Sequence, residues 1–517
     1  MAGQTRREFL KSVAVAAAAS TYPSVRAAGG SESGGPNVLF MMCDQLNASA
    51  LSCYGGPVPT PNIDRIASEG VRFTNATCVT PYCSPTRASI VTGMYPHAHG
   101  IVLNCAPRRQ RGITGDDCTT EKLLHEAGYA THHYGKWHLN GDSVPYYQDM
   151  FRPGFEYTKE MESVFAKARK RPDNRVMNWY SWALPVSIDP RFQRQVDTLG
   201  DKWNSKNFAE FIVKMGRLEL PLEECYDVQV AEHACGRLRE VAAGPNPFMV
   251  TCSFNWPHDP NVVPSPYYEM FDPEKIELPT NMNHREQRFE KNWAREIVRD
   301  LGEPGLREFL RGYYAMVKLI DDQVGRILDV LEESGRGDDT IVVFTADHGD
   351  MMGGHGMVWK STSAFYEEVV RVPLIIRYPA KLKPATTDIL ADSTDLMPTL
   401  LELAGKPVPE QAQGQSVAAF VTGRKPLSEG REYVFSERVR GNPKGLREVR
   451  PGTKGSFMIR GRRYKFMRYD NGEEFLYDLA EDPGEMRNLV KAPDRQGIRQ
   501  RMSEELDRWL GRTGWSG

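Results

Sequence analysis

The sequence predicts an α/β fold, in which helices flank a large, mostly parallel sheet and a small antiparallel sheet follows near the C-terminus. Three observations lead to this prediction. Strand-like apolar runs alternate with helical patterns, four of these runs end in polar clusters, and short strand candidates replace the pattern after about Arg431. Alternating strands and helices are typical of a parallel sheet covered by helices.

Four apolar runs are the clearest strands of the predicted large sheet. They are Val38–Met42, Tyr129–Tyr134, Phe248–Phe254 and Thr340–Thr345, of which the second has the weakest pattern. Short, nearly continuous apolar runs are expected of strands that are buried on both faces. A helix is predicted from Tyr313 to Leu331, because apolar residues recur along one of its faces.

The C-terminal part follows a different pattern. Short strand candidates at 433–435, 457–459, 464–466 and 475–477 are separated by Gly, Arg and Asp turns, and a closing helix runs from about Asp494 to Leu510. We therefore expect a catalytic domain over residues 36–425 and a subdomain of antiparallel sheet and helix over residues 426–517. Residues 140–230, rich in Trp, Tyr, Arg and Pro, are predicted to form a long insertion near the site.

The first 28 residues are predicted to be an export signal. The segment Thr5–Lys11 resembles the twin-arginine signal, and a mildly apolar stretch and a small-residue site at Ala27-Ala28 follow it. The stretch is too short to span a bilayer. The resemblance implies export by the twin-arginine translocase, after folding, to the periplasm or the medium. The alternative is a disordered basic tail.

Composition excludes several classes of function. The chain of 517 residues has a net charge of −2 and no basic run, so nucleic acid is not an expected partner. Its nine cysteines form no Cys-x-x-Cys pair, which argues against a zinc ribbon. An odd count leaves at least one cysteine unpaired, and the pattern does not define any disulfide.

Polar clusters follow the four strands of the large sheet. Asp44-Gln45 follows the first, Lys136-Trp137-His138 the second, His258 the third and Asp347-His348 the fourth. In open parallel sheets, sites form outside the carboxyl ends of the strands. Taken singly, Asp44 could cap a turn and His348 could be a satisfied loop histidine. Together they favour an active site.

Cys83 is the candidate nucleophile. Pro85 lies just inside the predicted start of a short helix, which places Cys83 at an N-terminus that favours anions. Arg87 is one turn further along the same face. Two other interpretations remain open from the residues alone: a buried cysteine near a helix cap, and a thiol nucleophile like that of a phosphatase.

The pattern Cys83-x-Pro85-x-Arg87, continued by Thr92–Gly100, resembles the signature of the type I sulfatases. In that family the cysteine is oxidised to formylglycine. Further matches at 366–376, 395–401 and 476–489 extend the resemblance over nearly the whole chain after the signal. The resemblance implies the alkaline phosphatase-like fold and a partner, the formylglycine-generating or sulfatase-maturating enzyme.

The resemblance also implies a cation site. Its ligands are Asp44, Gln45, Asp347, His348 and the formylglycine made from Cys83. Gln45 departs from the Asp-Asp pair common in the family, and it replaces a charge with a neutral carbonyl oxygen. Calcium is the first expectation, with Mg²⁺ or Mn²⁺ as alternatives, because a histidine ligand suits transition ions better.

Five further roles follow from the same resemblance. Lys136 and Lys360 bind sulfate, His138 handles a proton of the formylglycine hydrate, and His258 protonates the leaving alcohol. Arg87 completes the catalytic set. The hydrate attacks sulfur and then expels sulfate, so the aldehyde returns. An extended segment is expected to place Lys136 and His138 on one face.

The leading hypothesis is therefore a sulfuric ester hydrolase, most suited to a sulfated carbohydrate, since export and an aromatic, arginine-rich insertion fit an external glycan. One alternative is a phosphonate monoester or phosphodiester hydrolase of the same superfamily, which shares the Asp-Gln pair. Another is an inactive glycan-binding relative, against which the complete set of catalytic residues argues.

Overall fold

The computed structural model describes residues 34–105, 110–139, 149–151, 186–187, 189–192, 215–290, 292–360, 364–441 and 445–517. Gly35–Gly517 forms one compact unit. The predicted signal at 1–28 lies outside the described residues, and so does most of the predicted insertion at 140–230. Both therefore remain predictions.

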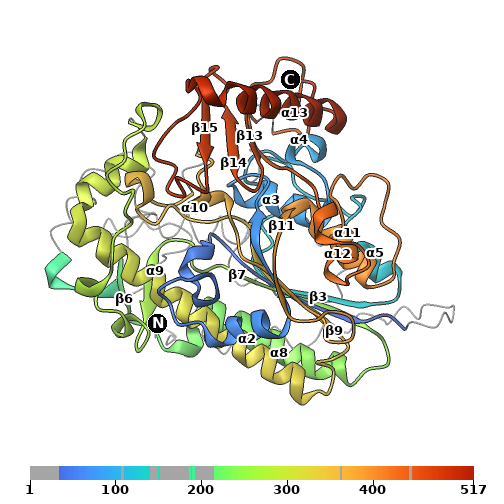
Figure 1. Ribbon diagram of the computed structural model, residues 1–517. Helices are drawn as coiled ribbons and strands as arrows, with labels where there is room; N and C mark the ends of the chain where they lie inside the picture. The colour runs from blue at the N-terminus through green and yellow to red at the C-terminus, as the bar shows by residue number, and fades with distance from the viewer. Residues whose placement is uncertain are drawn as a thin grey trace, which may run out of the picture. The chain divides into compact units, whose positions relative to one another are not determined.

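A sheet of eight strands forms the centre of this unit (Figure 1). Its order is β11-β2-β10-β9-β1-β7-β3-β4, and β10 alone among them runs antiparallel to its neighbours. The bounds are β1 Asn37–Cys43, β2 Val71–Thr77, β3 Ala130–Gly135, β4 Asp149–Phe151, β7 Phe248–Phe254, β9 Thr340–Ala346, β10 Leu374–Arg377 and β11 Ala385–Asp392. The four predicted strands are thus confirmed as β1, β3, β7 and β9.

The register of the central strands brings their carboxyl ends level. Cys43, the last residue of β1, pairs with Phe254 of β7 and with Ala346 of β9. Gly135 of β3 pairs with Ser253 of β7. The residues that follow these strands therefore start from one edge of the sheet.

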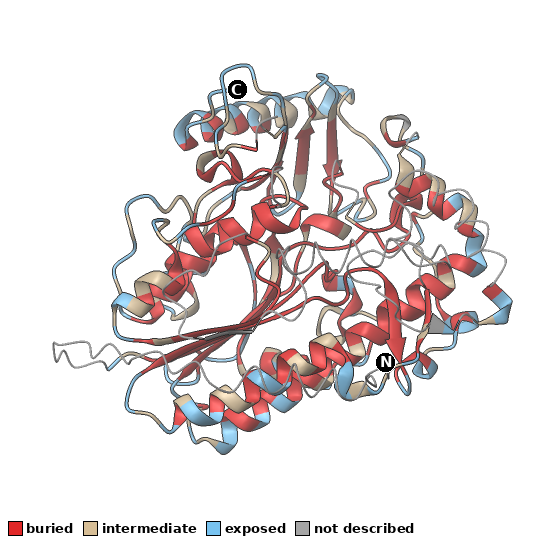
Figure 2. Ribbon diagram, turned by 180° about the vertical axis from the view of Figure 1, so that it is seen from behind, coloured by how far each residue is buried: buried red, intermediate tan, exposed pale blue. Residues whose placement is uncertain are grey.

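Helices cover both faces of the large sheet (Figures 1 and 2). On one face lie α2 Pro61–Glu69, α8 Tyr226–Ala242 and α9 Trp293–Glu333, and on the other α3 Cys83–Thr92, α5 Thr120–Glu126, α11 Leu396–Leu403 and α12 Ala418–Val421. The helix predicted from Tyr313 to Leu331 is the second half of α9, which bends at Gly302, where φ is 63°. Two short helices, α4 Pro96–His99 and α10 Glu367–Val370, also belong to this unit.

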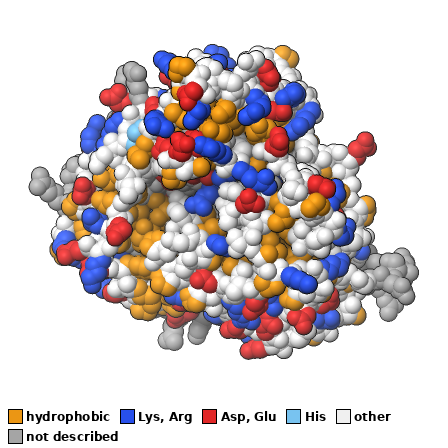
Figure 3. Space-filling model, viewed as in Figure 1, with side chains coloured by type: hydrophobic (Ala, Val, Ile, Leu, Met, Phe, Trp, Pro, Cys, Tyr) orange, Lys and Arg blue, Asp and Glu red, His pale blue; other side chains and the backbone are white. Residues whose placement is uncertain are grey.

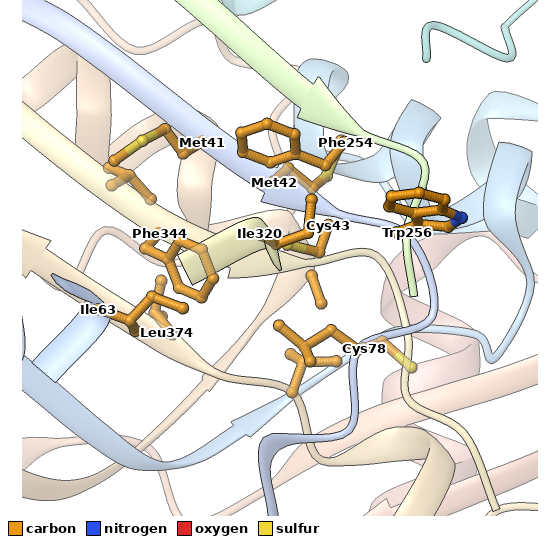
Figure 4. Packing of buried hydrophobic residues seen from close by; sticks show 14 of the residues in the cluster. Met41, Met42, Cys43, Ile63, Cys78, Phe254, Trp256, Ile320, Phe344 and Leu374 are labelled. Carbon is orange, nitrogen blue, oxygen red and sulfur yellow. The ribbon is translucent and has the colours of Figure 1, made fainter. Parts of the chain in front are cut away.

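The strands nearest the site are buried throughout. All seven residues of β1 and all seven of β9 are buried, as the sequence NVLFMMC of β1 leads one to expect. Figure 4 shows Met42 and Cys43 of β1 packed between Phe254 of β7 and Ile320 of α9. This packing gives the polar loops that follow the strands a rigid base.

The C-terminal sheet is antiparallel, as predicted. It consists of β12 Val434–Val439, β13 Gly455–Arg460, β14 Tyr464–Arg468 and β15 Glu474–Asp478, and helix α13 Gln496–Thr513 follows it. One face contributes Met458 and Met467 to the main hydrophobic core. The other face packs with Trp509 of α13 in a second core. A further small sheet joins β5 Val186–Ser187, β6 Met215–Leu218 and β8 Asn261–Pro264.

Three further features concern the cysteines, the helices and the surface charge. All nine cysteines lie among the described residues, and each is a free thiol. Among the described helices, none combines the length and apolar character that crossing a bilayer requires. Acidic and basic side chains are interspersed over the face drawn in Figure 3, in keeping with the small net charge.

Candidate active site

The polar residues predicted after the four strands do come together. Asp44 follows β1 and Asp347 follows β9, its neighbour in the sheet, while Lys136 follows β3. Lys136 Nζ lies 2.5 Å from Asp44 Oδ2, and His258 Nε2, from the loop after β7, lies 3.9 Å from Asp44 Oδ1. Asp44, Lys136 and Asp347 are fully buried, and His258 is 4% exposed.

The loops at this edge hold unusual backbone conformations. Six non-glycine residues of the described chain have positive φ, and Gln45, His138, Met352, His355 and Trp359 are five of them. All five follow β1, β3 or β9. Left-handed conformations cost about 1 kcal/mol or more each and persist where packing enforces them, which is common at functional sites.

Cys83 is the first residue of α3, as predicted, and it is fully buried. Its Sγ lies 3.2 Å from His348 Nε2, 3.6 Å from Lys360 Nζ and 3.7 Å from Asp44 Oδ1. Burial and the charge of Asp44 raise the pKa of this thiol, but the positive groups around it outweigh them and leave the pKa below its ordinary value. The site therefore favours negative charge at position 83.

Arg87 connects the two carboxylates. Its Nε donates to Asp347 Oδ2 at 2.8 Å and its Nη2 donates to Asp44 Oδ2 at 3.0 Å. Nη1 donates to the Lys136 carbonyl and to Ser253 Oγ, both at 2.8 Å. The guanidinium is 1% exposed, so it orients the carboxylates from behind.

Four of the predicted ligands form a candidate cation site. Ligand atoms of Asp44, Cys83, Asp347 and His348 lie within 4.8 Å of one another, and all four residues are buried. Arg87 holds one oxygen of each carboxylate, so Asp44 Oδ1 faces Cys83 and His348. Two carboxylates, an imidazole and the amide oxygen of Gln45 fit a divalent cation that prefers oxygen ligands.

The Gln45 amide has a defined orientation. Asp350 Oδ2 can only accept, and it receives a hydrogen bond from Gln45 Nε2 at 2.8 Å. Lys360 Nζ can only donate, and it does so to Gln45 Oε1 at 3.1 Å. Because an acceptor faces the nitrogen and a donor faces the oxygen, the carbonyl oxygen of Gln45 is turned towards the site.

His348 carries positive character. Its Nδ1 lies 2.9 Å from the Gly349 carbonyl oxygen, which leaves Nε2 directed at Cys83. Burial lowers the pKa of His348, but the charges of Asp347 and Cys83 raise it to about 9. The bond from Nδ1 to the Gly349 carbonyl fixes the ring, and a cation at Nε2 would take the place of the proton on that nitrogen.

Lys360 and His258 form a pair beside Cys83. Lys360 Nζ lies 2.8 Å from His258 Nε2, and His258 Nδ1 lies 2.9 Å from the Asp259 carbonyl oxygen. That carbonyl oxygen accepts the Nδ1 proton, so Nε2 accepts from the ammonium. Burial first, and then the charge of Lys360, lower the pKa of His258. The proton of the pair therefore resides on Lys360.

One local expectation was wrong. The segment after β3 is not extended through His138, because His138 has φ of 55°. Lys136 and His138 therefore do not share a face in the way that an extended strand would place them. Ser84 Oγ donates to the His138 carbonyl at 2.5 Å and holds this turn against the start of α3. Both residues still lie at the same edge of the sheet.

Sequence reasoning missed two buried acids. Asp350 is fully buried and accepts the backbone N–H groups of Met352 and Trp359 through Oδ1. Asp259 is 3% exposed, and burial raises its pKa to about 7. Both directly adjoin predicted clusters, Asp347-His348-Gly349 and His258, and that position was the available signal.

Comparisons with known proteins agree with this geometry. Residues 36–406 match the family model described as Sulfatase, and residues 353–511 match that of the N-sulphoglucosamine sulphohydrolase C-terminal region. An ulvan-active sulfatase of Formosa agariphila is 28% identical over 93% of this chain and 82% of its own.

Solved structures give the same result. The structure of a 2-O GAG sulfatase superposes with a TM-score of 0.68, at 26% identity, over 93% of this chain and 92% of its own. The structure of a phosphonate monoester hydrolase of Silicibacter pomeroyi superposes with a TM-score of 0.73, at 23% identity, over 92% of this chain and 96% of its own. This match shows that the two proteins share a fold. With a family model matched over most of its length, the chain belongs to the sulfatase family and is a sulfuric ester hydrolase with an alkaline phosphatase-like fold.

Proposed function

We propose that the protein removes sulfate from a sulfated carbohydrate, with a formylglycine formed from Cys83 as its nucleophile and a divalent cation beside it. The observation that carries the proposal is the buried group of Asp44, Cys83, Asp347 and His348 at the N-terminus of α3. The relatives described as an ulvan-active sulfatase and a 2-O GAG sulfatase support carbohydrate as the class of substrate.

The proposed cation ligands are Asp44, Gln45, Asp347 and His348, together with the modified residue 83. A bound cation supplies positive charge that stabilises negative charge developing at the nucleophile. Oxygen donors make calcium the first candidate, with magnesium and manganese as alternatives. We expect a chelator to abolish activity and calcium to restore it best. Full activity in the presence of the chelator would contradict a cation requirement, and better restoration by manganese would reassign the ion.

The surrounding side chains have separate proposed roles. Lys360 Nζ, 3.6 Å from Cys83 Sγ, is placed to bind sulfate oxygens, and the proton it shares with His258 serves the leaving alcohol. Lys136 and Arg87 keep Asp44 ionised and oriented. His138, held by Ser84, remains the proposed group for a proton at residue 83. Lys136 contacts Asp44, so its action on sulfate is through charge.

The experiment that tests the nucleophile is mass spectrometry of the tryptic peptide 73–87 from protein made with a maturating enzyme. Formylglycine replaces sulfur and two hydrogens by one oxygen, so the peptide loses mass and gains an aldehyde that reacts with hydrazides. Cys78 lies in the same peptide and provides an internal control, because fragmentation separates the two positions. An intact thiol at Cys83 in active protein would exclude the proposed nucleophile.

A phosphonate monoester or phosphodiester is the second candidate substrate, favoured by the neutral Gln45 in place of an acid. Sulfate monoesters and phosphodiesters both carry one negative charge, so the charge of the site does not separate them. The ratio of kcat/KM for matched aryl sulfate and phosphodiester substrates does. We expect the sulfate ester to be preferred, and the reverse ratio would favour the second candidate.

Export by the twin-arginine translocase, to the periplasm or the medium, is proposed from Arg6-Arg7 and the residues after it. Replacing both arginines by lysine keeps the charge, and it is expected to retain the protein in the cytoplasm. Replacing Arg65, outside the signal, provides the control. Export of the double-lysine variant at the normal level would contradict this route.

A further inference from the structure

A pocket is lined by residues other than those of the cluster around Cys83. Its volume is about 540 Å³, and it is lined by the first part of α9, the segment Met282–Glu290 and Gly356. Six of its lining residues are charged: Arg285, Arg295, Arg299, Glu286, Glu290 and Glu303. A volume of this size is typical of a site for a small molecule or one sugar unit. We call it the arginine pocket.

The three arginines lack ion partners within the described part of the chain. No carboxylate oxygen there lies within 4.0 Å of Arg285, Arg295 or Arg299, whereas Arg288, close by in sequence, pairs with Glu473 at 2.5 Å. Arg285 uses Nη1 to donate to the carbonyl oxygens of Met282 and His284. The pocket therefore presents guanidinium groups that form no direct ion pair with a carboxylate in the described chain.

Arg295 is the strongest sign of a ligand. It is only 7% exposed, and it donates to the carbonyl oxygens of His355 at 2.8 Å, Glu286 at 3.2 Å and His284 at 3.4 Å. These carbonyls fix the guanidinium but do not neutralise it. Its Nε is buried and has no acceptor among the residues that the structure describes. A buried, unpaired charge is costly unless an anion completes the site.

The three glutamates of the arginine pocket restrict the kind of ligand that can bind there. Glu286, Glu290 and Glu303 line the same pocket, and their negative charges oppose a bare inorganic anion. Carboxylates also accept hydrogen bonds from hydroxyl groups. A ligand with both an anionic group and several hydroxyls satisfies the two sets at once. We propose that the arginine pocket binds an acidic sugar unit, whose carboxylate or sulfate group the arginines hold.

The same loop borders the pocket and carries part of the active site. Gly356 lines the pocket, and Lys360 follows four residues later. Asp350 closes this loop by accepting the N–H groups of Met352 and Trp359. An acidic sugar in the pocket would thus be another unit of the glycan whose sulfate is removed, and this last step rests on the proposed function.

The test is calorimetric titration of D-glucuronate into the full chain carrying Cys83→Ala, which excludes turnover. The informative variant is Arg285→Gln with Arg299→Gln, both exposed residues whose replacement leaves the core intact. The matched control is Arg239→Gln with Arg501→Gln, two exposed helical arginines that also lack an ion pair in the described chain. Neutral glucose and inorganic sulfate serve as comparison ligands.

We expect glucuronate to bind the Cys83→Ala chain and its control variant equally, and the pocket variant at least about tenfold more weakly, since a charge-assisted hydrogen bond contributes that much. Glucose and inorganic sulfate should bind more weakly than glucuronate. Absent glucuronate binding, or equal binding to the pocket variant, would overturn the proposal. Inorganic sulfate binding as tightly as glucuronate would overturn the assignment to a sugar.

Kinetics separate this inference from the proposed function. In the pocket variant with an intact Cys83, KM for a sulfated, uronate-containing oligosaccharide should rise while kcat stays constant. KM for a small aryl sulfate should not change. If no sulfate ester is hydrolysed by any form, the proposed function fails while calorimetry still decides the pocket. An unchanged oligosaccharide KM beside altered glucuronate binding would reject the link to the substrate.

Discussion

Two hydrogen bonds to Gln45 determine which of its atoms faces the candidate cation site. A glutamine amide can present either oxygen or nitrogen, and only the oxygen suits a cation. Asp350 holds the nitrogen and Lys360 the oxygen. A buried carboxylate therefore selects the orientation in which this neutral residue would offer oxygen to the proposed cation, and we propose Asp350 as a positioning residue.

Asp350→Asn tests this role. The N–H groups of Met352 and Trp359 require an acceptor and would take the oxygen of the new amide, so its nitrogen would face Gln45 Nε2, and two donors cannot pair. Lys360 still donates to the Gln45 oxygen, so the amide can keep one of its two hydrogen bonds but not both, and its carbonyl oxygen is no longer held towards the site. We expect calcium affinity to fall by about 10- to 100-fold, measured by calorimetric titration into chelator-treated protein. Asp338→Asn, at an exposed position, is the control. Unchanged affinity would exclude the positioning role.

Helix α4 contacts strand β12 of the C-terminal sheet through a buried ion pair. Nδ1 of His97, in α4, lies 2.6 Å from Glu437 Oε2, in β12. Nε2 of the same ring lies 3.1 Å from the Thr513 carbonyl oxygen. Both partners are acceptors, which favours the doubly protonated ring. Burial lowers the pKa of His97, but the charge of Glu437 and these hydrogen bonds raise it above its ordinary value. The ion pair fastens α4 to the C-terminal sheet.

This pair predicts a pH dependence of stability. The folded pKa of His97 is raised, so its contribution is complete below the unfolded value of about 6.5 and is lost as pH rises through the folded pKa. His97→Gln should therefore lower the melting temperature most near pH 6, and the gap to wild type should narrow towards pH 9. Scanning calorimetry across that range measures it. A gap that widens with pH would contradict the assignment.

The sequence predicts those structural elements whose formation depends on a single local property, such as a continuous apolar run. The four strands were found because continuous apolar runs are buried on both faces, and their polar ends meet because parallel strands share an edge. The conformation of His138 was not predictable from the sequence, since its left-handed backbone depends on how the loop packs against Ser84. The burial of Arg87 behind the carboxylates, and of Asp350 and Asp259, depends on contacts distant in sequence, which local patterns do not contain.

At the scale of the whole molecule, the C-terminal sheet is integrated with the rest. Met458 and Met467 belong to the main core, and Arg460 and Lys465 bind Glu367 of α10 through buried ion pairs. The domain boundary expected between residues 425 and 426 therefore separates the catalytic domain from strands that contribute to its hydrophobic core. Unpairing a buried charge costs about 3–5 kcal/mol.

Deleting residues 426–517 is accordingly expected to prevent folding of the remainder. The truncated chain would expose one face of the main core and leave Glu367 without Arg460 and Lys465. Circular dichroism and limited proteolysis of purified protein measure this, with the deletion of residues 1–28 as the control. A truncated chain that melts cooperatively near the temperature of the full chain would support an independent domain instead.

Cys83, the first residue of α3, has no exposed surface, and Asp44, His348 and Lys360 lie within 3.7 Å of its sulfur. The maturating enzyme that we propose would therefore reach this thiol before the chain has finished folding. Folding would then compete with oxidation of Cys83. A molecule that folds before it is oxidised would keep the thiol. Slower folding should raise the yield of active enzyme, and a modifying enzyme added after folding should raise it only once the chain is unfolded again.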